Sequence, residues 1–358
     1  MSQALRPELQ QAVEDVVASG FLGAALRVQN EEGEQEGAAG LARIGDLAAP
    51  PADGRFRIGS NTKTFAAALA LGLAAEGVLD LDGPVAEHLS GRNLDRRITA
   101  RMLLQHTSGL FNFTGELGAD GGYLPGIPAP GTPKGGEWLD DRFRTYRPDE
   151  LIAVSLARPP RFEPGTSWSY SNTNYVLLRL LVEQVTGRPF AGEMRRLVLD
   201  PLGLSGTMTP ESASELPEPH AHAYYRHGPE TIDVTCHDPS WISTGGDMIS
   251  TNRDLTAFLS GLLGGRLLPA ALLAEMCTPH PTGIPGMGYG LGVFVQETKG
   301  GPVITHNGGI AGYATLMYGA PGGGTVMAAS LTCVDDSRLS IAPAFLNAQR
   351  RLVGEVFG

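Results

Sequence analysis

Ser60 and Lys63 stand three positions apart in the sequence. On a helix such positions share one face, so the lysine amine can lie beside the serine hydroxyl. The amine can take the hydroxyl proton only in its neutral form, which requires its pKa to fall about 3 units from roughly 10.4, on the order of 4 kcal/mol. Burial causes shifts of that size, and the apolar residues Phe65, Leu69 and Leu73 predict that this helix is buried. The pair therefore indicates a serine nucleophile activated by a lysine base.

The lysine is informative because the chain takes most of its positive charge from arginine. Only Lys63, Lys134 and Lys299 are lysines among the 27 basic residues, and arginine cannot give up its proton to act as a base. The alternative interpretation is an exposed lysine on a surface helix. Two further motifs favour the catalytic interpretation.

Tyr170 and Asn172 form the second motif, at the start of a helix predicted over residues 172–185. A phenol and an amide two residues apart on a loop can face the same way, as a proton shuttle and a bidentate hydrogen-bonding group. The third motif is His306-Asn307-Gly308-Gly309, at the end of a predicted strand. Its glycines allow close approach of a backbone or a substrate and leave N–H groups free to stabilise an oxyanion. Taken singly, Asn172 is better explained as a helix cap and His306 as a buried strand-end residue.

The elements that must position these motifs run from sheet to helix and back to sheet. A helix at 7–19 and a hairpin of strands at 22–29 and 36–43 come first. Helices dominate the middle third, and strands return after about residue 224 between Gly and Pro turns. The other predicted helices are 65–76, 99–105, 172–185, 252–263, 269–277 and 341–356, and the later strands are 289–296, 302–305, 313–319 and 325–332. Strands at both ends of a helical insertion imply two lobes with a cleft between them.

This order predicts a discontinuous α/β lobe, residues 1–64 and 225–358, and a mainly helical lobe, residues 65–224. Residues 115–136 contain eight Gly and four Pro, which is too irregular for a helix or a strand and long for a passive connection. Our hypothesis is a mobile flap over the cleft. The alternative is a surface loop without a role.

The three motifs, in this order, resemble those of the serine β-lactamase and penicillin-recognising family. The resemblance is closest to the class C-like branch, which contains DD-carboxypeptidases, D-aminopeptidases and related esterases, and it covers nearly the whole chain. Further matching landmarks are residues 56–60, 103–110, 164–165, 170–175, 245–246 and 289–292. The resemblance implies a two-lobed β-lactamase-like fold, in which an antiparallel sheet flanked by helices is joined to a helical insertion lobe.

The resemblance also implies a role for each motif residue. Ser60 would be the nucleophile, Lys63 its base and Tyr170 the group that relays a proton to the leaving atom. Asn172 would orient the acyl side of the substrate, and His306 would be hydrogen-bonded near Tyr170. The oxyanion hole would consist of the backbone N–H groups of Ser60 and Gly309. Whether Lys63 or Tyr170 takes the first proton stays open, because the two groups titrate together.

Departures from the family pattern bear on the substrate. Carboxypeptidases of this branch grip a substrate carboxylate with two threonines and an arginine, and the corresponding residues here are Asn307, Gly309 and Phe294. The loss of such charged contacts costs on the order of 1.5–3 kcal/mol. We therefore predict weak β-lactamase and DD-carboxypeptidase activity and a donor that is neutral on its leaving side.

Several aromatic residues lie near the landmarks and are candidates for the walls of the cleft. They are Phe111, Phe113, Trp241 and Phe294, and Asn307 joins them as a candidate substrate-binding residue. Aromatic residues are more often plain core, which is the alternative for each of them.

Composition excludes several classes of function. The chain has 358 residues and a formal charge of −11, so we expect no nucleic-acid partner. Its longest apolar stretch, residues 65–75, is shorter than the roughly 18–20 residues that cross a bilayer, so no membrane partner is expected. Acidic residues at positions 8, 14 and 15 argue against a secretory signal. Three widely spaced cysteines fit reduced thiols, and the expected location is cytoplasmic.

We expect neither a cofactor nor a metal. His220 and His222 lack an accompanying acidic helix motif and are interpreted as a pair without a catalytic role. The leading hypothesis is a serine hydrolase that acts on an ester, an amide or a peptide through an acyl-enzyme at Ser60. The alternatives are an acyltransferase or ATP-independent amide or ester synthase that uses the same intermediate, and a catalytically inactive binding protein, against which the complete residue set argues.

Overall fold

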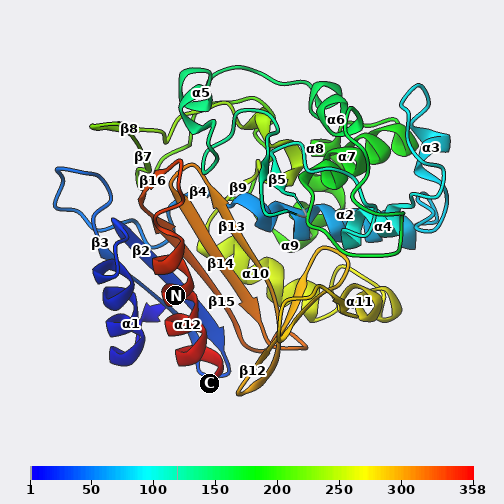
Figure 1. The fold of residues 1–358 in the computed structure, drawn as a ribbon. Helices are drawn as coiled ribbons and strands as arrows, with labels where there is room; N and C mark the ends of the chain where they lie inside the picture. Colours follow the sequence, from blue (N-terminus) through cyan, green and yellow to red (C-terminus); the bar gives the residue numbers. More distant parts are fainter. Residues whose placement is uncertain (1, 119) are drawn as a thin grey trace.

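The computed structural model describes residues 2–118 and 120–358. Its main element is a nine-stranded sheet with the order β1-β3-β2-β15-β14-β13-β12-β11-β10, in which β1 and β3 are parallel and the other neighbours are antiparallel (Figure 1). The strands are β1 (Gln3–Ala4), β2 (Gly23–Asn30), β3 (Gly33–Gly40), β10 (His280–Pro281), β11 (Met287–Tyr289), β12 (Phe294–Thr298), β13 (Gly301–Ile310), β14 (Tyr313–Gly319) and β15 (Val326–Thr332). The first and last thirds of the chain therefore build one sheet.

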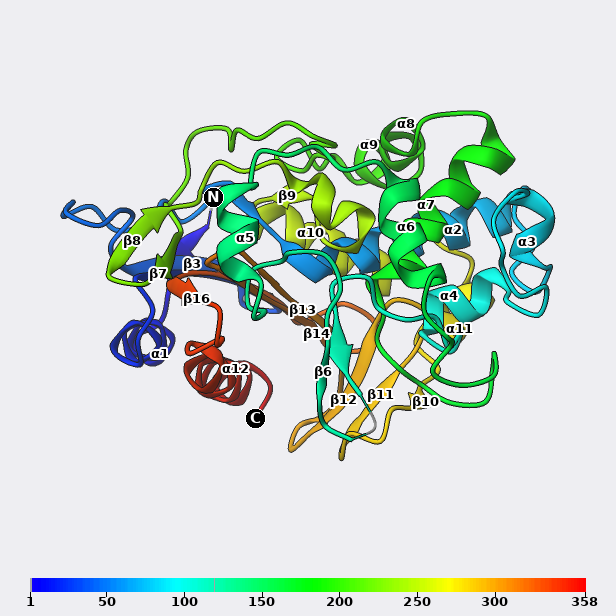
Figure 2. The same cartoon turned by 45° about the horizontal axis from the view of Figure 1, so that its top comes forward.

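Helices cover both faces of this sheet. Alternate side chains of a strand point to opposite faces, so apolar side chains on each face pack against a layer of helices. On one face, Leu316 belongs to the core formed with α1 (Pro7–Ala18) and α12 (Ala342–Phe357), which lie side by side (Figure 2). On the other face, Met317 belongs to the core that contains α10 (Asn252–Leu263). The sheet is thus the middle layer between the α1–α12 pair and α10.

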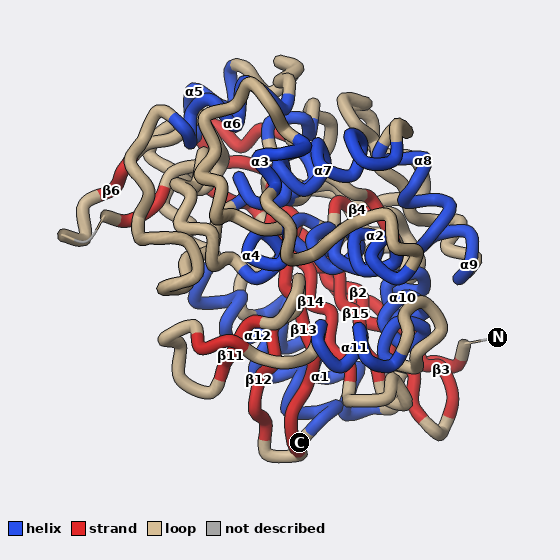
Figure 3. Tube along the Cα trace, turned by 90° about the vertical axis from the view of Figure 1, so that its right-hand side faces the viewer, coloured by secondary structure: helices blue, strands red, loops and turns tan. Residues whose placement is uncertain are grey.

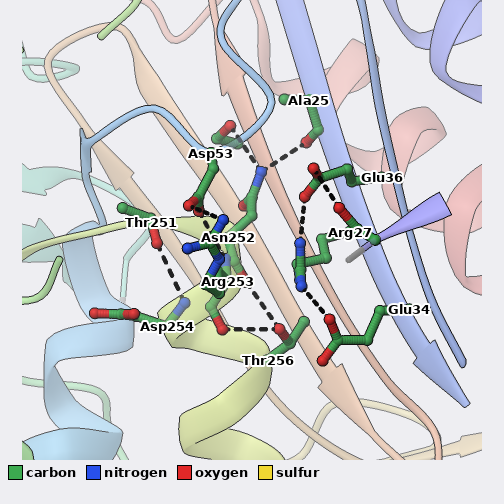
Figure 4. A network of polar contacts seen from close by, with 12 residues as sticks. Ala25, Arg27, Glu34, Glu36, Asp53, Thr251, Asn252, Arg253, Asp254 and Thr256 are labelled. Atoms are coloured by element: carbon green, nitrogen blue, oxygen red, sulfur yellow. Dashed lines mark hydrogen bonds and ion pairs between the residues drawn. The ribbon is translucent and has the colours of Figure 1, made fainter. Parts of the chain in front are cut away.

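Helix α10 is attached to the sheet by polar contacts at its first turn (Figure 4). The Asn252 amide donates to the Ala25 carbonyl at 3.2 Å, and the Thr251 hydroxyl caps the helix by accepting from the Asp254 N–H at 3.2 Å. Beside them, the buried Arg27 guanidinium lies between two carboxylates of β3. These contacts satisfy polar groups that the packing of α10 would otherwise leave buried without partners.

Most of the remaining helices lie above α1 and α12 in Figure 3, and α11 lies at the right-hand side of Figure 1. They are α2 (Thr62–Ala75), α3 (Val85–His88), α4 (Ala100–Gln105), α5 (Gly135–Asp140), α6 (Pro148–Leu156), α7 (Asn172–Thr186), α8 (Phe190–Met194), α9 (Asp200–Leu202) and α11 (Ala270–Met276). Every residue of α2 from Thr62 to Leu73 is buried, so this helix is surrounded by protein on all sides. The division of the chain into two lobes at residues 64 and 225 stays a prediction.

Small sheets complete the fold at the loops. They are β4 (Phe56–Arg57) with β9 (Ile249–Ser250), β5 (Glu116–Leu117) with β6 (Tyr123–Leu124), and β16 (Val334–Asp336) with β7 (Tyr224–His227) and β8 (Glu230–Asp233). The β5–β6 pair corrects the expectation that residues 115–136 hold no strand. That this segment acts as a flap stays a prediction.

Most predicted elements agree with the structure, and three differ. The strand predicted over 289–296 is two strands, because Gly292 has a φ of +80° and a Cβ there would lie 2.3 Å from the Ala67 Cβ. The second strand of the first hairpin starts at Gly33 instead of residue 36, since Asn30 pairs directly with Gly33. The strand predicted over 302–305 continues to Ile310, which brings the whole third motif into the sheet.

Strand β13 lies against the turn that carries Ser60, and glycines make this approach possible. A Cβ on Gly308 would lie 2.0 Å from the Ile58 carbonyl oxygen. Gly59 has a φ of +51°, and a Cβ there would lie 2.6 Å from the Gly309 nitrogen. Gly308 therefore admits a neighbouring backbone, as the sequence predicted for this motif, whereas a Cβ on Gly309 would meet only the Tyr313 carbonyl oxygen, at 4.0 Å.

Substitution of Gly308 tests this contact. We expect Gly308→Ala to lower the free energy of unfolding by about 1–3 kcal/mol, because the new methyl group must push β13 away from the Ser60 turn. Gly324→Ala is the matched control, since a Cβ at that position meets nothing within 4 Å. Urea unfolding of the two variants measures the difference. Equal stability of both variants would contradict the close approach.

Candidate active site

The turn that carries Ser60 is held in place by a neighbouring segment. Gly59–Asn61 forms a single 3-10 turn that leads directly into α2. The Ile58 N–H donates to the Met248 carbonyl at 3.0 Å, and the Met248 N–H donates to the Thr62 hydroxyl at 3.1 Å. Both sides of the turn are therefore tied to the same residue.

Lys63 lies one turn after Ser60 and points back toward it, as the spacing predicted. Its Nζ is 3.1 Å from the Ser60 Oγ and 2.8 Å from the Asn172 Oδ1, and it also donates to the Gly245 carbonyl. The side chain is fully buried, and this burial lowers the pKa of Lys63 well below its ordinary value. Desolvation thus favours the neutral amine, as the buried face of the helix predicted.

The partners of Lys63 determine where its lone pair points. The Asn172 Oδ1 and the Gly245 carbonyl can only accept hydrogen bonds, so they take the two N–H groups of a neutral amine. The remaining position of the nitrogen, with its lone pair, then faces the Ser60 Oγ. Tyr170 approaches the same oxygen, and its hydroxyl donates to it at 2.7 Å. Burial raises the pKa of Tyr170, which keeps the phenol protonated. The serine oxygen therefore lies between a proton acceptor and a proton donor.

Asn172 begins α7, and both ends of its amide have protein partners. Its Oδ1 accepts from Lys63, and its Nδ2 donates to the Thr114 hydroxyl at 3.1 Å. Its backbone N–H donates to the Asn112 side chain at 3.0 Å. The contact with Lys63 joins α7 to α2. That Asn172 also orients the acyl side of a substrate stays a prediction.

His306 lies beside the site, and its side-chain partner is Tyr289. Its Nε2 is 3.2 Å from the Tyr289 hydroxyl, whereas the ring centroids of His306 and Tyr170 are 6.4 Å apart. Burial lowers the pKa of His306 to about 3, so the ring is neutral. Its Nδ1 lies 2.9 Å from the Asn307 carbonyl, which can only accept. The proton is therefore on Nδ1, and Nε2 accepts from Tyr289.

His106 supports the Tyr170 loop and received no role from the sequence, although it lies in the landmark at residues 103–110. Its Nδ1 accepts from the Ser171 N–H at 3.3 Å and lies 2.9 Å from the Asn174 amide nitrogen. Its ring centroid is 4.4 Å from that of Tyr170. It terminates α4 with a backbone φ of +62°, a conformation that residues other than glycine rarely adopt. This strained residue fixes the backbone on either side of Tyr170.

Asp247 is a second group that the sequence analysis missed. It is 2% exposed, and its Oδ1 has no hydrogen-bond partner within residues 2–118 and 120–358. It lies two residues after Gly245, whose carbonyl accepts from Lys63. Burial raises the pKa of Asp247 to about 6, and its negative form raises the pKa of Lys63. The landmark at residues 245–246 was the signal that pointed to this segment.

A cavity of about 270 Å³ opens at Ser60. Its described lining residues are Ser60, Tyr170, Met287, Phe294, Thr305, His306, Asn307 and Gln349. Phe294 and Asn307 therefore lie where the sequence placed them. Asn307 is half-buried and donates from its Nδ2 to the Tyr318 hydroxyl at 2.9 Å. Gly309 is exposed on β13 next to the Ser60 turn, and its role in an oxyanion hole stays a prediction.

The other three aromatic candidates do not line this cavity. Trp241 borders a neighbouring cavity of about 340 Å³. Phe113 is completely buried, and Phe111 is buried with its carbonyl accepting from Ser155 at 2.6 Å. The Arg158 guanidinium lies over the Phe111 ring. Both phenylalanines are core residues because the loop after α4 turns inward to pack against α6 and α7.

Two expected absences concern the part of the chain that the structure covers. Among residues 2–118 and 120–358, no group of three His, Cys, Asp or Glu side chains is arranged to hold a metal ion. None of the described helices combines the length and the apolar character needed to span a bilayer. The Nδ1 of His222 is within hydrogen-bond distance of the Asp233 carboxylate, at 2.7 Å.

The fold and the four converging side chains identify the family. The Beta-lactamase family model matches residues 9–346, and the chain belongs to this family. The predicted family and fold class are thereby confirmed.

Individual relatives include hydrolases and penicillin-binding proteins. The chain is similar to a D-stereospecific amidohydrolase from Streptomyces sp., with 37% identity, a TM-score of 0.82 and coverage of 95% of this chain and 97% of that one. It is 30% identical to penicillin-binding protein 4 of Amycolatopsis lactamdurans over 94% of this chain and 86% of that protein. It is 33% identical to esterase EstB of Burkholderia gladioli over 50% of this chain and 44% of that protein. The chain spans only 53% and 57% of two Bacillus subtilis relatives.

The coupling between Asp247 and Lys63 predicts a change in the pH profile. Above pH 6 the Asp247 carboxylate favours the ammonium form of Lys63, so Asp247→Asn lowers the pKa of Lys63 further. Because a lysine that serves as a base must be neutral, we expect the acidic limb of kcat/KM for an activated ester to move to lower pH. Glu76→Gln, at the far end of α2, is the control that changes the net charge equally. An unchanged limb in Asp247→Asn would contradict the coupling.

Proposed function

We propose that this protein is a serine hydrolase that cleaves an amide, ester or peptide bond of a small-molecule or peptide acyl donor through an acyl-enzyme at Ser60. The observation that carries the proposal is the position of the Ser60 Oγ, 3.1 Å from the Lys63 amine and 2.7 Å from the Tyr170 hydroxyl. The similarity to proteins named amidohydrolase and esterase supports this reaction class.

Acylation follows from the protonation states that burial favours. The Ser60 Oγ attacks the carbonyl carbon of the donor while its proton moves to the lone pair of Lys63. The negative charge on the carbonyl oxygen is stabilised by the N–H groups of Ser60 and Gly309. When the tetrahedral intermediate collapses, the leaving nitrogen or oxygen takes the Tyr170 proton, and Lys63 returns a proton to Tyr170. Each proton removed from the serine thus reaches the leaving group.

Deacylation uses the same groups in the reverse direction. A water molecule attacks the acyl carbon and transfers one proton toward Tyr170 and Lys63, and the Ser60 Oγ is reprotonated as it leaves. The product is a carboxylic acid, and the site returns to its initial protonation state. Asn172 and the Gly245 carbonyl keep the amine oriented in both halves of the reaction.

The charges around the Ser60 cavity support a donor that is neutral on its leaving side. Of the residues given above as its lining, none is an arginine or a lysine, and the pKa of His306 near 3 leaves this ring uncharged at neutral pH. Phe294 lies in this wall, where the carboxypeptidases that the sequence resembles place an arginine. A free carboxylate would therefore lose its water shell without gaining a charged partner.

Transfer of the acyl group to another acceptor is the second candidate. Asn307 lines both cavities, and this supports room for an acyl group and an acceptor near Ser60 at the same time. Graded addition of an amine to a p-nitrophenyl ester reaction measures the partitioning between hydrolysis and transfer. Product formed only by hydrolysis at high amine concentration would exclude this candidate.

The acyl-enzyme can be observed directly. Incubation with a p-nitrophenyl ester should add one acyl mass to the intact protein, and Ser60→Ala should abolish the adduct. Lys63→Met should lower the rate of acylation by roughly 10³-fold or more, because the serine loses its base. Ser90→Ala, at an exposed position, is the control. An adduct that persists in Ser60→Ala would refute the assignment of the nucleophile.

The leaving-side charge is tested with a matched pair of donors. We expect an acyl-D-Ala-D-Ala peptide to be cleaved with a kcat/KM about 10- to 100-fold below that of its C-terminal amide, which corresponds to one missing charged hydrogen bond. Phe294→Arg should narrow this ratio by supplying the absent cation. Efficient cleavage of the free carboxylate by the unaltered protein would overturn the inference.

A further inference from the structure

The second cavity, of about 340 Å³, runs along the turn between β13 and β14. Its wall is largely apolar and includes Trp241, Ile310, Ile341 and Phe345. This volume lies within the range of small-molecule sites, about 300–1,000 Å³. The cavity is therefore large enough to take a side chain of a substrate.

This cavity lies next to the proposed site of acylation. Asn307 borders both cavities, and Gly308 and Gly309 form part of the wall of the second one. Gly309 is also the residue whose N–H we assign to the oxyanion hole. When the carbonyl carbon of a donor is held at Ser60, a side chain on its acyl side can therefore extend into this cavity.

Asp335 is the one charged side chain among the described residues that line the second cavity. It lies on β16 and is 8% exposed, and its Oδ1 accepts from the Asp336 N–H at 2.8 Å. Burial raises the pKa of Asp335 to about 6, so the carboxylate is mostly charged at neutral pH. A buried carboxylate in an apolar wall favours a cationic partner.

The position of Asp335 limits what that partner can be. The backbone N–H of Gly312, at the tip of the turn, contacts the Asp335 carboxylate, and Gly312 is three residues beyond Gly309. Gly309 and Gly312 are at most about 10 Å apart, at about 3.3 Å per residue, and the turn that contains Gly312 shortens this distance. An α-ammonium group lies only about 2.5 Å from its own carbonyl carbon, two bonds of about 1.5 Å away, so it extends a short way into the cavity. A lysine-type amine, six bonds away, reaches about 7–8 Å and needs about 2.8 Å more for the hydrogen bond.

We propose that the second cavity is the acyl-side pocket and selects donors whose side chain has an apolar stem and a terminal cation, of the lysyl type, paired with Asp335. This inference rests on the proposed function, because it requires an acyl donor at Ser60. The apolar wall formed by Trp241, Ile341 and Phe345 packs on the stem, and the carboxylate receives the ammonium group. The pocket thereby supplies the charge recognition that the Ser60 cavity lacks.

The test compares two esters that differ only at the end of the side chain. N-acetyl-lysine methyl ester and N-acetyl-norleucine methyl ester, each as the D and the L form, are assayed with the unaltered protein and with Asp335→Asn. We expect a preference of about ten-fold or more for the lysyl ester in kcat/KM, and the loss of this preference in Asp335→Asn. Asp336→Asn, the neighbouring carboxyl, should retain the preference.

A second measurement does not depend on how Asp335→Asn folds. With the unaltered protein, n-butylammonium should inhibit ester hydrolysis competitively at concentrations at which n-butanol does not. Equal rates for the two esters, a lysyl preference that survives in a folded Asp335→Asn, or equal inhibition by amine and alcohol would each overturn the inference. Turnover of p-nitrophenyl acetate distinguishes a failure of this inference from a failure of the proposed function. If the protein hydrolyses this ester but shows no lysyl preference, only the pocket assignment is refuted. If the protein does not hydrolyse it, the proposed function is refuted.

Discussion

The burial of the Lys63 amine is the constraint on which the rest of the site depends. A charged ammonium in this position would have to give up its water for three oxygen partners, and desolvation moves the balance toward the neutral base. That burial requires α2 to be enclosed on all sides, which only a helix rich in small and aliphatic residues can be. The apolar composition of α2 is thus a chemical requirement of the site as well as a packing requirement of the fold.

Close backbone approach is the second requirement, and it explains the glycines around the nucleophile. The Ser60 turn touches β13 on one side and the segment after Gly245 on the other, so side chains at Gly59 and Gly308 would force these backbones apart. The turn is therefore clamped between a strand from the last third of the chain and a segment that precedes α10. The same contact places the backbone nitrogen of Gly309 beside Gly59, the residue before Ser60. Precision at Ser60 comes from backbone contacts, which side-chain motion does not disturb.

The motifs made much of this site predictable, because each carries its chemistry within a few residues. The spacing of Ser60 and Lys63 leads directly to their contact, and helical periodicity located α7 and α10. Contacts between segments that are far apart in the sequence were harder to predict. The pairing of His306 with Tyr289 and the inward turn of Phe111 and Phe113 depend on how separate segments cross in space. Asp247 escaped notice since a single carboxyl after two glycines has no periodic or spacing signal.

Charge separates the two cavities and links the proposals about substrate. The Ser60 cavity has a neutral imidazole and a phenyl ring in its wall, so it does not compensate an anionic leaving group. The neighbouring cavity has the buried carboxylate of Asp335 in its wall, so it disfavours an anion and favours a cation there. A donor that satisfies both has its only charge on the acyl side, remote from the scissile bond. Selectivity would then come from desolvation, which penalises each wrongly placed charge, more than from shape.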